Sequence, residues 1–397
     1  MAQPWILVTG GAGFVGSHLV DELVRRGHRV RVLDALIPQV HGPSGTPPPY
    51  LPKSVEFIRG DVRDAEAWRR ALKDAAVVFH DAAEVGVGQS MYEIVRYVEA
   101  NTLGTARLLQ ELITGAYAVK KVIVASSMSI YGEGQYRCAG PSTRLSASLG
   151  AVPSERSESR DGCGVVYPSI RPDAQLAARQ WEVRCPACQQ SVASEPTDES
   201  KPLLPTSVYA ITKRDQEELC LSVGRAYRIP TVALRYFNIY GPRQSLSNPY
   251  TGVAAIFSSR LRNGHAPKIF EDGRQSRDFI HVRDIVQANL LAMERPEADY
   301  EVFNVGTGVS TSILQVAEAL RDALRATVSP EIVSQFRAGD IRHCYADIAK
   351  IRQRLGFKPT VSLREGIVDL VAWAQEAPAE DRVDQAIQEL AARGLTR

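Results

Sequence analysis

The chain has 397 residues, 44% of them hydrophobic, and its 47 basic and 45 acidic side chains leave a formal net charge of +2. This length supplies a core for two domains or one large α/β unit, and the balanced charge excludes the electrostatic footprint of a protein that binds nucleic acid or an anionic membrane. The first residues show no secretory signal, and no run of about 18 apolar residues follows, so we expect a cytoplasmic protein without a membrane segment. Six cysteines are too few for a disulfide framework.

The first predicted elements form a strand, a tight turn and a helix. The apolar run 5–9 predicts the strand, and residues 17–26 have the apolar spacing of a helix. Between them lie three glycines with the spacing G-x-x-G-x-x-G, namely Gly10, Gly13 and Gly16. Their missing side chains let the backbone approach a pyrophosphate at the helix N-terminus. Asp34 ends the next predicted strand, where a carboxylate binds the adenosine ribose and favours NAD over NADP; a tight turn and a strand cap are the alternative.

The next two strand ends place further candidate residues beside such a cofactor. Asp61 and Val62 follow the third predicted strand, in position to meet adenine, and Ala82 and Ala83 follow the fourth. Parallel strands deliver their carboxyl ends to one edge of a sheet, where open α/β sheets bind ligands. Each of these junctions, taken alone, is also typical of an ordinary strand-to-loop turn.

Two later segments supply candidate catalytic side chains. The predicted strand 121–126 delivers Ser127 at its carboxyl end, and a predicted helix begins at Tyr209 with Lys213 four residues later on the same face. A nearby ammonium and a positive nicotinamide ring both favour phenolate. We therefore expect a lowered pKa for Tyr209, so that it exchanges a proton with a sugar hydroxyl near neutral pH, with Ser127 as a hydrogen-bonding bridge.

In this order and spacing, the motifs resemble those of an extended short-chain dehydrogenase/reductase of the nucleotide-sugar epimerase type, over nearly the whole chain. The matching segments are "TGGAGFVG", "GDVRD", "NTLGT", "SSMSIYG", "YAITK", "LRYFNIYGPRQ", "GRQSRDFIHVRD" and "FNVGTG". The resemblance implies an α/β fold in which residues 1–237 form a Rossmann-type doubly wound parallel sheet, interrupted by an insertion at 133–201. Residues 238–397 would form a smaller nucleotide-sugar domain with segments that return to the main sheet. It also implies NAD as the cofactor and a nucleotide sugar as the substrate.

The resemblance further implies roles for individual residues. Ser127, Tyr209 and Lys213 would form the catalytic triad, with Lys213 also holding the nicotinamide ribose. The cofactor is expected to meet Tyr209, Lys213 and, beyond the residues named above, Phe14, Val15, Asn101, Ser126 and Tyr236. The nucleotide sugar is expected to meet Glu84, Ser127, Ser129, Asn238, Phe270, Arg277 and Arg342.

Several of these substrate residues have other interpretations. The guanidinium of Arg277 suits a bidentate grip on a diphosphate, whereas Arg342 is equally explained by a surface ion pair. Phe270 either stacks on the nucleotide base or belongs to the core. Asp81 stands where relatives often carry an apolar residue, and Glu84 lies in a loop that approaches the sugar; each carboxylate either binds a hydroxyl or is solvated.

Members of this family share oxidation at C4 of the sugar and then diverge. In a 4,6-dehydratase an Asp-Glu pair directly follows the hydroxyl residue of the strand end, and in a decarboxylase a Glu follows it; here Met128 and Ser129 stand there. We therefore expect a 4-epimerase, which requires only that the ketone rotate and take hydride back on its other face. The alternatives are a dehydratase, decarboxylase or reductase on the same fold, and a non-catalytic NAD-binding module.

The segment between Tyr131 and Tyr209 is longer than in the simplest epimerases and is rich in Ser, Pro, Gly and Arg, so we expect a loop-rich insertion. Within it, Cys185 and Cys188 have the spacing of a zinc knuckle, and Cys138 and Cys163 supply two more thiols. We expect a structural zinc site that fastens the insertion over the sugar pocket, with a disulfide or free thiols as alternatives. The segments "WEVRCPAC" and "PTDESKP" are similar to the insertion of proteins assigned as dTDP-L-rhamnose 4-epimerases. Helices 95–112 and 209–226 are the pair through which relatives dimerise, so we expect a homodimer.

Overall fold

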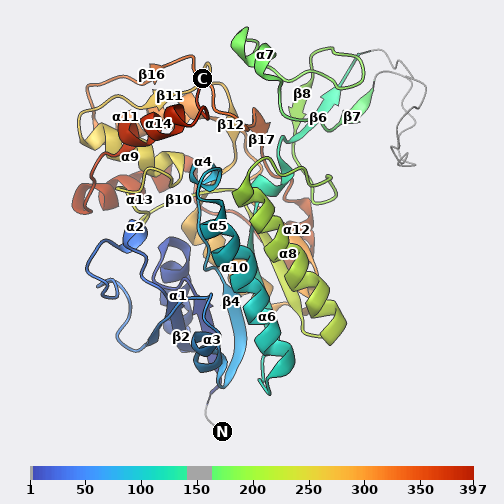
Figure 1. Ribbon diagram of the computed structural model, residues 1–397, viewed down its shortest axis with the longest axis vertical. Helices are drawn as coiled ribbons and strands as arrows, with labels where there is room; N and C mark the ends of the chain where they lie inside the picture. Colours follow the sequence, from blue (N-terminus) through green and yellow to red (C-terminus); the bar gives the residue numbers. More distant parts are fainter. Residues whose placement is uncertain (1–2, 141–162) are drawn as a thin grey trace.

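The computed structural model describes residues 3–140 and 163–397, and its centre is a parallel sheet of seven strands (Figure 1). The strands are β1 (Trp5–Thr9), β2 (Arg29–Asp34), β3 (Glu56–Arg59), β4 (Ala75–His80), β5 (Lys121–Ser127), β9 (Thr231–Tyr236) and β14 (Val302–Val305). They follow the order β14-β9-β5-β4-β1-β2-β3, so the strand order reverses between β1 and β4. Open parallel sheets bind ligands outside the carboxyl ends of the strands at such a reversal.

Helices cover both faces of this sheet, which confirms the predicted doubly wound fold. One face packs against α1 (Phe14–Arg25), α10 (Val282–Glu294) and α12 (Ala349–Leu355). The other face packs against α3 (Ala65–Leu72), α6 (Gly104–Thr114) and α8 (Val208–Tyr227). The central strands are therefore buried on both sides, which explains why their sequences are nearly continuous apolar runs.

A second, smaller unit stands over the carboxyl edge of the sheet. Its core lies among α9 (Val253–Arg262), α11 (Ile313–Leu324) and α13 (Leu363–Glu376). Short strand pairs complete it: β10 (Asn238–Tyr240) with β13 (Phe279–His281), β11 (Lys268–Ile269) with β16 (Glu331–Ile332), and β12 (Ser276–Arg277) between β15 (Thr311–Ser312) and β17 (His343–Cys344). The segments α10, β14 and α12 return from this part of the chain to the main sheet.

The insertion carries a small antiparallel sheet of its own, beside β17 (Figure 1). The order is β7-β6-β8, with β6 (Gln135–Cys138), β7 (Gly164–Val166) and β8 (Ala193–Glu195), and the helix α7 (Asp173–Ala177) follows β7. A separate cluster of buried side chains holds this sheet together: Tyr136, Cys138, Val166, Val183 and Cys185. The predicted loop-rich insertion thus has a core, although residues 141–162 lie outside the described part.

The remaining helices are short, apart from the last. They are α2 (Pro38–His41), α4 (Val87–Ser90), α5 (Ile94–Tyr97), the π-helical turn η1 (Val98–Leu103), the 3-10 turns η2 (Met128–Tyr131) and η3 (Pro296–Ala298), and α14 (Val383–Ala392). α5, η1 and α6 follow one another without a break. Across the described ranges, we find no helix with the length and apolar character needed to span a bilayer.

Candidate active site

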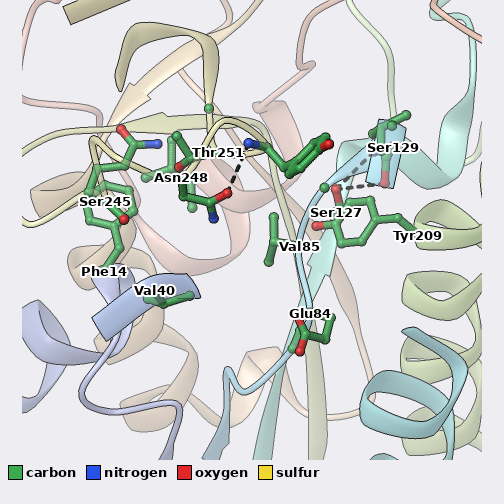
Figure 2. Close-up of a pocket in the computed structure, with 18 of the residues that line it drawn as sticks. Phe14, Val40, Glu84, Val85, Ser127, Ser129, Tyr209, Ser245, Asn248 and Thr251 are labelled. Carbon is green, nitrogen blue, oxygen red and sulfur yellow. Dashed lines mark hydrogen bonds between the residues drawn. The ribbon is translucent and has the colours of Figure 1, made fainter. Parts of the chain in front are cut away.

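A cavity of about 1120 Å³ opens at the carboxyl edge of the central sheet. Its walls come from the ends of β1, β2, β4, β5 and β9 and from the second unit, including α9 and α14. Figure 2 shows Phe14 and Val40 at one side of the cavity and Ser127, Ser129 and Tyr209 gathered at the other. A cavity of this size and position accommodates two ligands side by side.

The turn between β1 and α1 forms one end of this cavity, and close contacts require its glycines. Gly10 has a φ of +67°, and a Cβ there would lie 3.0 Å from the backbone of Ala82. A Cβ on Gly16 would lie 2.3 Å from the carbonyl oxygen of Gly10. Gly13 is the N-cap residue of α1 and has no capping side chain, so the first amides of the helix remain available to a phosphate.

Asp34 ends β2 with its carboxylate at the cavity wall. One oxygen accepts a hydrogen bond from the Ala12 amide at 3.0 Å, and the other accepts one from the Leu36 amide at 2.9 Å. Each carboxylate oxygen has two acceptor positions, so both retain capacity for ribose hydroxyls. The two amides fix the orientation of a negative charge that repels the extra phosphate of NADP, which fits NAD.

Most of the predicted cofactor residues line the cavity, namely Gly10, Gly13, Phe14, Val15, Gly16, Asp34, Asp61, Val62, Ala82, Ala83, Ser126, Tyr209, Lys213 and Tyr236. Asn101 does not. It is fully buried, and its amide group binds the backbone N–H and C=O of Glu84 at 2.7 and 3.0 Å and the Thr212 hydroxyl at 3.0 Å. Asn101 therefore holds the loop that carries Glu84.

The predicted catalytic residues meet at the opposite end of the cavity. Ser127 ends β5, and its Oγ accepts hydrogen bonds from the Ser129 hydroxyl at 2.9 Å and the Ser129 amide at 3.2 Å (Figure 2). Tyr209 lies in the first turn of α8 and shares a hydrogen bond with Ser127. Lys213, one turn later, donates to the Ala125 carbonyl at 2.8 Å. The end of β5 and the start of α8 thus bring a hydroxyl, a phenol and an amine together.

Two serines fix the start of α8. Ser207 caps the helix by accepting a hydrogen bond from the Ala210 amide at 3.1 Å, and Ser90 accepts one from the Tyr209 amide at 3.0 Å. The ring of Tyr209 packs edge-on against that of Tyr97, with 6.5 Å between the centroids. The phenol therefore has a defined position at the cavity wall.

Burial has the largest effect on the pKa values of Tyr209 and Lys213. It raises the pKa of Tyr209, and the hydrogen bond with Ser127 offsets this only in part. Burial also lowers the pKa of Lys213 to about 8, a change that Asp81 opposes. The expected lowering of the Tyr209 pKa is therefore absent in the protein alone, because loss of hydration outweighs the neighbouring groups. A positive ring in the cavity acts in the opposite direction.

The predicted substrate residues that line the cavity are Glu84, Ser127, Ser129, Asn238, Phe270 and Arg277. Oδ1 of Asn238 is buried and has no hydrogen-bond partner within residues 3–140 and 163–397. Arg277 donates to the backbone carbonyl of Ile341 at 2.7 Å, which holds its guanidinium at the wall. Phe270 belongs to the wall and not to a core cluster, so its position suits stacking on a base.

The two carboxylates that follow β4 are not solvated. Glu84 is 8% exposed and accepts a hydrogen bond from the guanidinium of Arg96 at 2.8 Å. Both carboxylate oxygens of Asp81 are buried. The interpretation of these residues as surface charges therefore fails, and Glu84 reaches the cavity as half of an ion pair.

The structure does not bring Arg342 to the cavity. Its side chain is fully buried, and its guanidinium lies 2.9 Å from Glu271, 2.7 Å from Asp272 and 2.5 Å from Glu182 of the insertion. Neither a nucleotide contact nor a surface ion pair describes this residue. It is instead the centre of a buried ion network that also contains Arg171, because Arg171 binds Glu271 at 2.8 Å.

Two cavity residues in the same segment escaped the sequence analysis. Arg337 and Asp340 line the cavity near Arg277, and the Arg337 guanidinium donates to Asp340 at 2.9 Å and lies 4.9 Å from the ring centroid of Phe270. The turn at Gly339, with a φ of +80°, presents both side chains. In the sequence, Gly339 indicates a turn, and Arg337 and Asp340 lie beside it. This turn is the signal from which the two cavity residues could have been predicted.

α14 supplies an apolar wall of the cavity. The cavity residues from this region are Val383, Ala386, Ile387, Leu390 and Leu395. The segment after α14 pairs with the segment that carries Arg337, through two backbone hydrogen bonds of 2.8 and 2.9 Å between Phe336 and Arg397. The C-terminal segment therefore closes one side of the cavity.

The four cysteines of the insertion form a cluster away from this cavity. The sulfur atoms of Cys138, Cys163, Cys185 and Cys188 all lie within 4.8 Å of one another. The turn that carries two of them is closed by hydrogen bonds from the Cys185 amide to the Gln190 carbonyl and from the Gln189 amide to the Cys185 carbonyl, both 2.9 Å. A backbone hydrogen bond at Gln190 is the main reason that the pKa of Cys188 is lowered to about 7.

Comparison with known proteins agrees with this geometry. Residues 6–150 and 185–306 match the model of the NAD dependent epimerase/dehydratase family. The chain is 37% identical to a dTDP-L-rhamnose 4-epimerase of Burkholderia thailandensis, over 94% of this chain and 95% of that protein. It is 31% identical to a putative UDP-glucose 4-epimerase of Methanocaldococcus jannaschii, over 93% of this chain and 97% of that protein.

Solved structures show the same architecture with ligands bound. A UDP-glucose 4-epimerase of Thermotoga maritima, solved with UDP-glucose, has a TM-score of 0.71 and 32% identity over 94% of this chain and 99% of its own. A UDP-glucose 4-epimerase of Thermus thermophilus, solved with NAD, has a TM-score of 0.70 and 30% identity over 94% of this chain and 100% of its own. The glycine turn, the Ser-Tyr-Lys group and these matches together place the chain in the NAD dependent epimerase/dehydratase family.

Proposed function

We propose that this protein is an NAD-dependent nucleotide-sugar 4-epimerase in which Tyr209 is the acid/base and the substrate is a dTDP- or UDP-sugar. One observation carries the proposal: Ser127, Tyr209 and Lys213 converge in the same cavity as the glycine turn and Asp34. One continuous cavity connects these two groups of residues. A dinucleotide held at the glycine turn can therefore reach the catalytic end.

The cofactor and the three residues of the catalytic group would have separate roles in the reaction. NAD, when bound, supplies a hydride acceptor and donor for C4 of the sugar. Tyr209 takes the proton of the C4 hydroxyl as that carbon is oxidised and returns a proton when the ketone is reduced. Ser127 holds the C4 oxygen by a hydrogen bond, and Lys213 favours the phenolate against the opposing effect of burial.

The surroundings of Ser127 favour epimerisation over elimination. Met128 and Ser129 follow it, and neither can remove the proton on C5 of the sugar. The loop carboxylate Glu84 is committed to Arg96. The Asp-Glu pair of the dehydratases and the Glu of the decarboxylases are therefore missing after Ser127, and the complete Ser-Tyr-Lys group disfavours a non-catalytic binding module.

The nucleotide end of the cavity supports recognition of a diphosphate and a pyrimidine base. Arg277 and Arg337 place two guanidinium groups at one wall, and Phe270 offers a stacking surface. The 37% identity to a dTDP-L-rhamnose 4-epimerase supports dTDP over UDP. The apolar side chains of α14 at the cavity wall are compatible with a deoxysugar, which has fewer hydroxyl groups to satisfy.

The test is turnover of a panel of dTDP- and UDP-sugars, dTDP-L-rhamnose included, with C4 epimers resolved by NMR. We expect interconversion of a dTDP-sugar without added cofactor, and transient transfer of deuterium from C4 to bound NAD. Tyr209→Phe should lower kcat at least about 100-fold and still bind NAD, whereas Tyr97→Phe should lose far less. Stoichiometric consumption of added NADH would show a reductase, and full activity of Tyr209→Phe would exclude the assigned acid/base.

We also propose that the cysteine cluster binds one structural zinc ion. Tetrahedral coordination with Zn–S bonds of about 2.3 Å separates the sulfur atoms by about 3.8 Å. The observed Cys138–Cys188 separation is 3.4 Å, and all four atoms fall within 4.8 Å. A disulfide requires about 2.05 Å. Four thiolates leave no open position, so the ion would fasten the insertion. Thiols persist in a reducing compartment, so a thiolate site of this kind suits a cytoplasmic location.

A homodimer is the remaining element of the proposal. Apolar side chains are exposed along α5, η1 and α8, including Val95 at 68% and Ile94 at 50%. Val98, Leu103 and Ile211 extend this stripe. Burying this stripe against a second copy would form a bundle of four helices and remove the patch from water.

A further inference from the structure

Asp81 is a buried carboxylate that the mechanism above leaves unused. It directly follows β4 and contributes to the cavity wall. Both of its carboxylate oxygens are buried, and neither has a hydrogen-bond partner in the described ranges 3–140 and 163–397. A buried carboxylate without a partner is costly, so such a residue is expected to have a charged or hydrogen-bonding counterpart in the working protein.

The neighbours of Asp81 place it between the glycine turn and the catalytic group. Its backbone adjoins the glycine turn, since a Cβ on Gly10 would lie 3.2 Å from the carbonyl carbon of Asp81. Lys213 from α8 and Tyr236 from β9 are near enough to interact with it electrostatically. Lys213 binds the Ala125 carbonyl and not this carboxylate.

The residue that directly precedes Asp81 is also titratable, but it is neutral. His80 binds Thr9 and Thr105 at 2.9 Å each, and burial lowers its pKa to about 3. Burial also raises the pKa of Asp81 to about 7, although Lys213 opposes this. A further positive charge close to Asp81 therefore converts it to the carboxylate at neutral pH.

We propose that Asp81 is the electrostatic counterpart of the nicotinamide ring, and that its carboxylate stabilises oxidised NAD relative to reduced NAD in this cavity. The inference rests on the proposed NAD-dependent epimerase. Oxidation of the sugar sends a hydride from C4 to the ring and the O4 proton to Tyr209, so the ring loses its positive charge. Asp81 opposes that loss and thereby favours return of the hydride to the ketone. It acts as a positioning charge, while Tyr209 moves the proton.

Removal of Asp81 should shift the balance between oxidised and reduced cofactor, and the direction of this shift distinguishes the proposed role from a simpler one. In the simpler role, Asp81 only balances the charge of Lys213. If Asp81 faces the ring, its removal destabilises the oxidised cofactor. If Asp81 serves only as a counter-charge for Lys213, its removal makes Lys213 more readily neutral, and the loss of that positive charge stabilises the oxidised cofactor. The two roles therefore shift the balance of oxidised and reduced cofactor in opposite directions.

The experiment measures the dissociation constants of NAD and NADH separately, without any sugar, for the wild type, Asp81→Asn and Asp81→Leu. We expect the ratio Kd(NAD)/Kd(NADH) to rise at least about tenfold in both variants, which corresponds to about 30 mV in the two-electron potential of the bound cofactor. Two different substitutions of Asp81 are used, so that a folding defect in one variant still leaves the other to be measured. Asp340→Asn, which removes a carboxylate from the nucleotide end of the same cavity, should leave the ratio unchanged.

An unchanged ratio in both Asp81 variants overturns the proposal, and a lowered ratio assigns Asp81 to Lys213 instead. Because no sugar is present, the outcome does not depend on which reaction the protein catalyses. A protein that binds both cofactor forms but turns over no nucleotide sugar would contradict the proposed function and leave this measurement interpretable.

Discussion

Arg171 of the insertion and Glu271 of the second unit form a buried two-point ion pair, with N–O distances of 2.8 and 2.9 Å. Glu271 adopts a φ of +57°, a left-handed conformation that costs a side-chain-bearing residue about 1 kcal/mol or more. The ion pair holds this turn, and the residue before it, Phe270, lines the cavity. The described part of the insertion therefore supports the nucleotide end of the site without itself lining the cavity.

Arg171→Met should destabilise the protein by about 3 to 5 kcal/mol, because it leaves Glu271 buried with half of its charge partners. It should also raise KM for the nucleotide sugar more than it changes NAD affinity. Chemical denaturation and steady-state kinetics measure the two effects. Arg354→Met, which removes an exposed pair with Glu301, is the control and should cost at most about 1 kcal/mol. Equal effects of the two substitutions would contradict the supporting role.

Zinc removal should loosen the insertion first. We expect one zinc per chain by elemental analysis, and loss of this zinc in Cys185→Ser and Cys188→Ser. The Cys220→Ser variant changes a buried cysteine outside the cluster and should keep the metal. Proteolysis should then cut the insertion of the metal-free protein before the rest of the chain. A wild-type protein purified without chelator and free of zinc would exclude the site.

Lys213 should impose a pH dependence on stability. Burial lowers its pKa from 10.5 to about 8, so below pH 8 the folded state carries a buried charge that the unfolded state hydrates. Between pH 8 and 10.5 the unfolded state binds more protons, and stability therefore rises with pH. Relative to Lys213→Met, the free energy of unfolding without cofactor should rise by up to about 3 kcal/mol over this window. Parallel pH curves for the two proteins would refute this prediction.

The wall formed by α14 should affect substrate binding more than chemistry. Leu390 lies at the cavity, and a Cβ on Gly88 would lie 3.3 Å from it. Leu390→Ala should raise KM for the nucleotide sugar several-fold through lost apolar contact, with little change in kcat or in NAD affinity. Val368→Ala, at an exposed position of α13, is the matched control. A fall in kcat alone would show that α14 acts on the catalytic group.

The exposed stripe on α5 and α8 should determine the oligomeric state. Val95→Glu places a charge in the centre of the proposed interface and should shift the protein to a monomer in sedimentation equilibrium. Val368→Glu adds the same charge to another exposed valine and should not. If the wild type is itself monomeric, the proposed interface does not form.

The parts of the site that follow local rules were predictable. Gly16 must be glycine because any Cβ would collide with the Gly10 carbonyl, and Asp34 reaches the cavity because it ends β2. Ser127 and Tyr209 were identifiable because a strand end and a helix start have recognisable sequence patterns. In each of these cases the local backbone determines where the side chain points.

The parts that depend on contacts between distant segments were not predictable. Arg337 and Arg342 lie in one irregular segment, and nothing in its pattern shows that the first faces the cavity and the second the insertion. Asn101 binds the Glu84 loop because η1 passes behind that loop, which only the tertiary structure reveals. The return of α14 to the cavity likewise requires its partners, Phe336 and the residues around Gly88.

The adjacency of Phe270 and Glu271 also constrains attempts to re-engineer this scaffold. Replacing the segment around them with that of an enzyme that prefers another base would remove the carboxylates on which Arg171 and Arg342 depend. Arg171 would then lose its two-point partner, and Arg342 would keep only Glu182 of its three carboxylate partners. A change of base preference therefore requires matching substitutions in the insertion. The two regions must change together even though they are far apart along the chain.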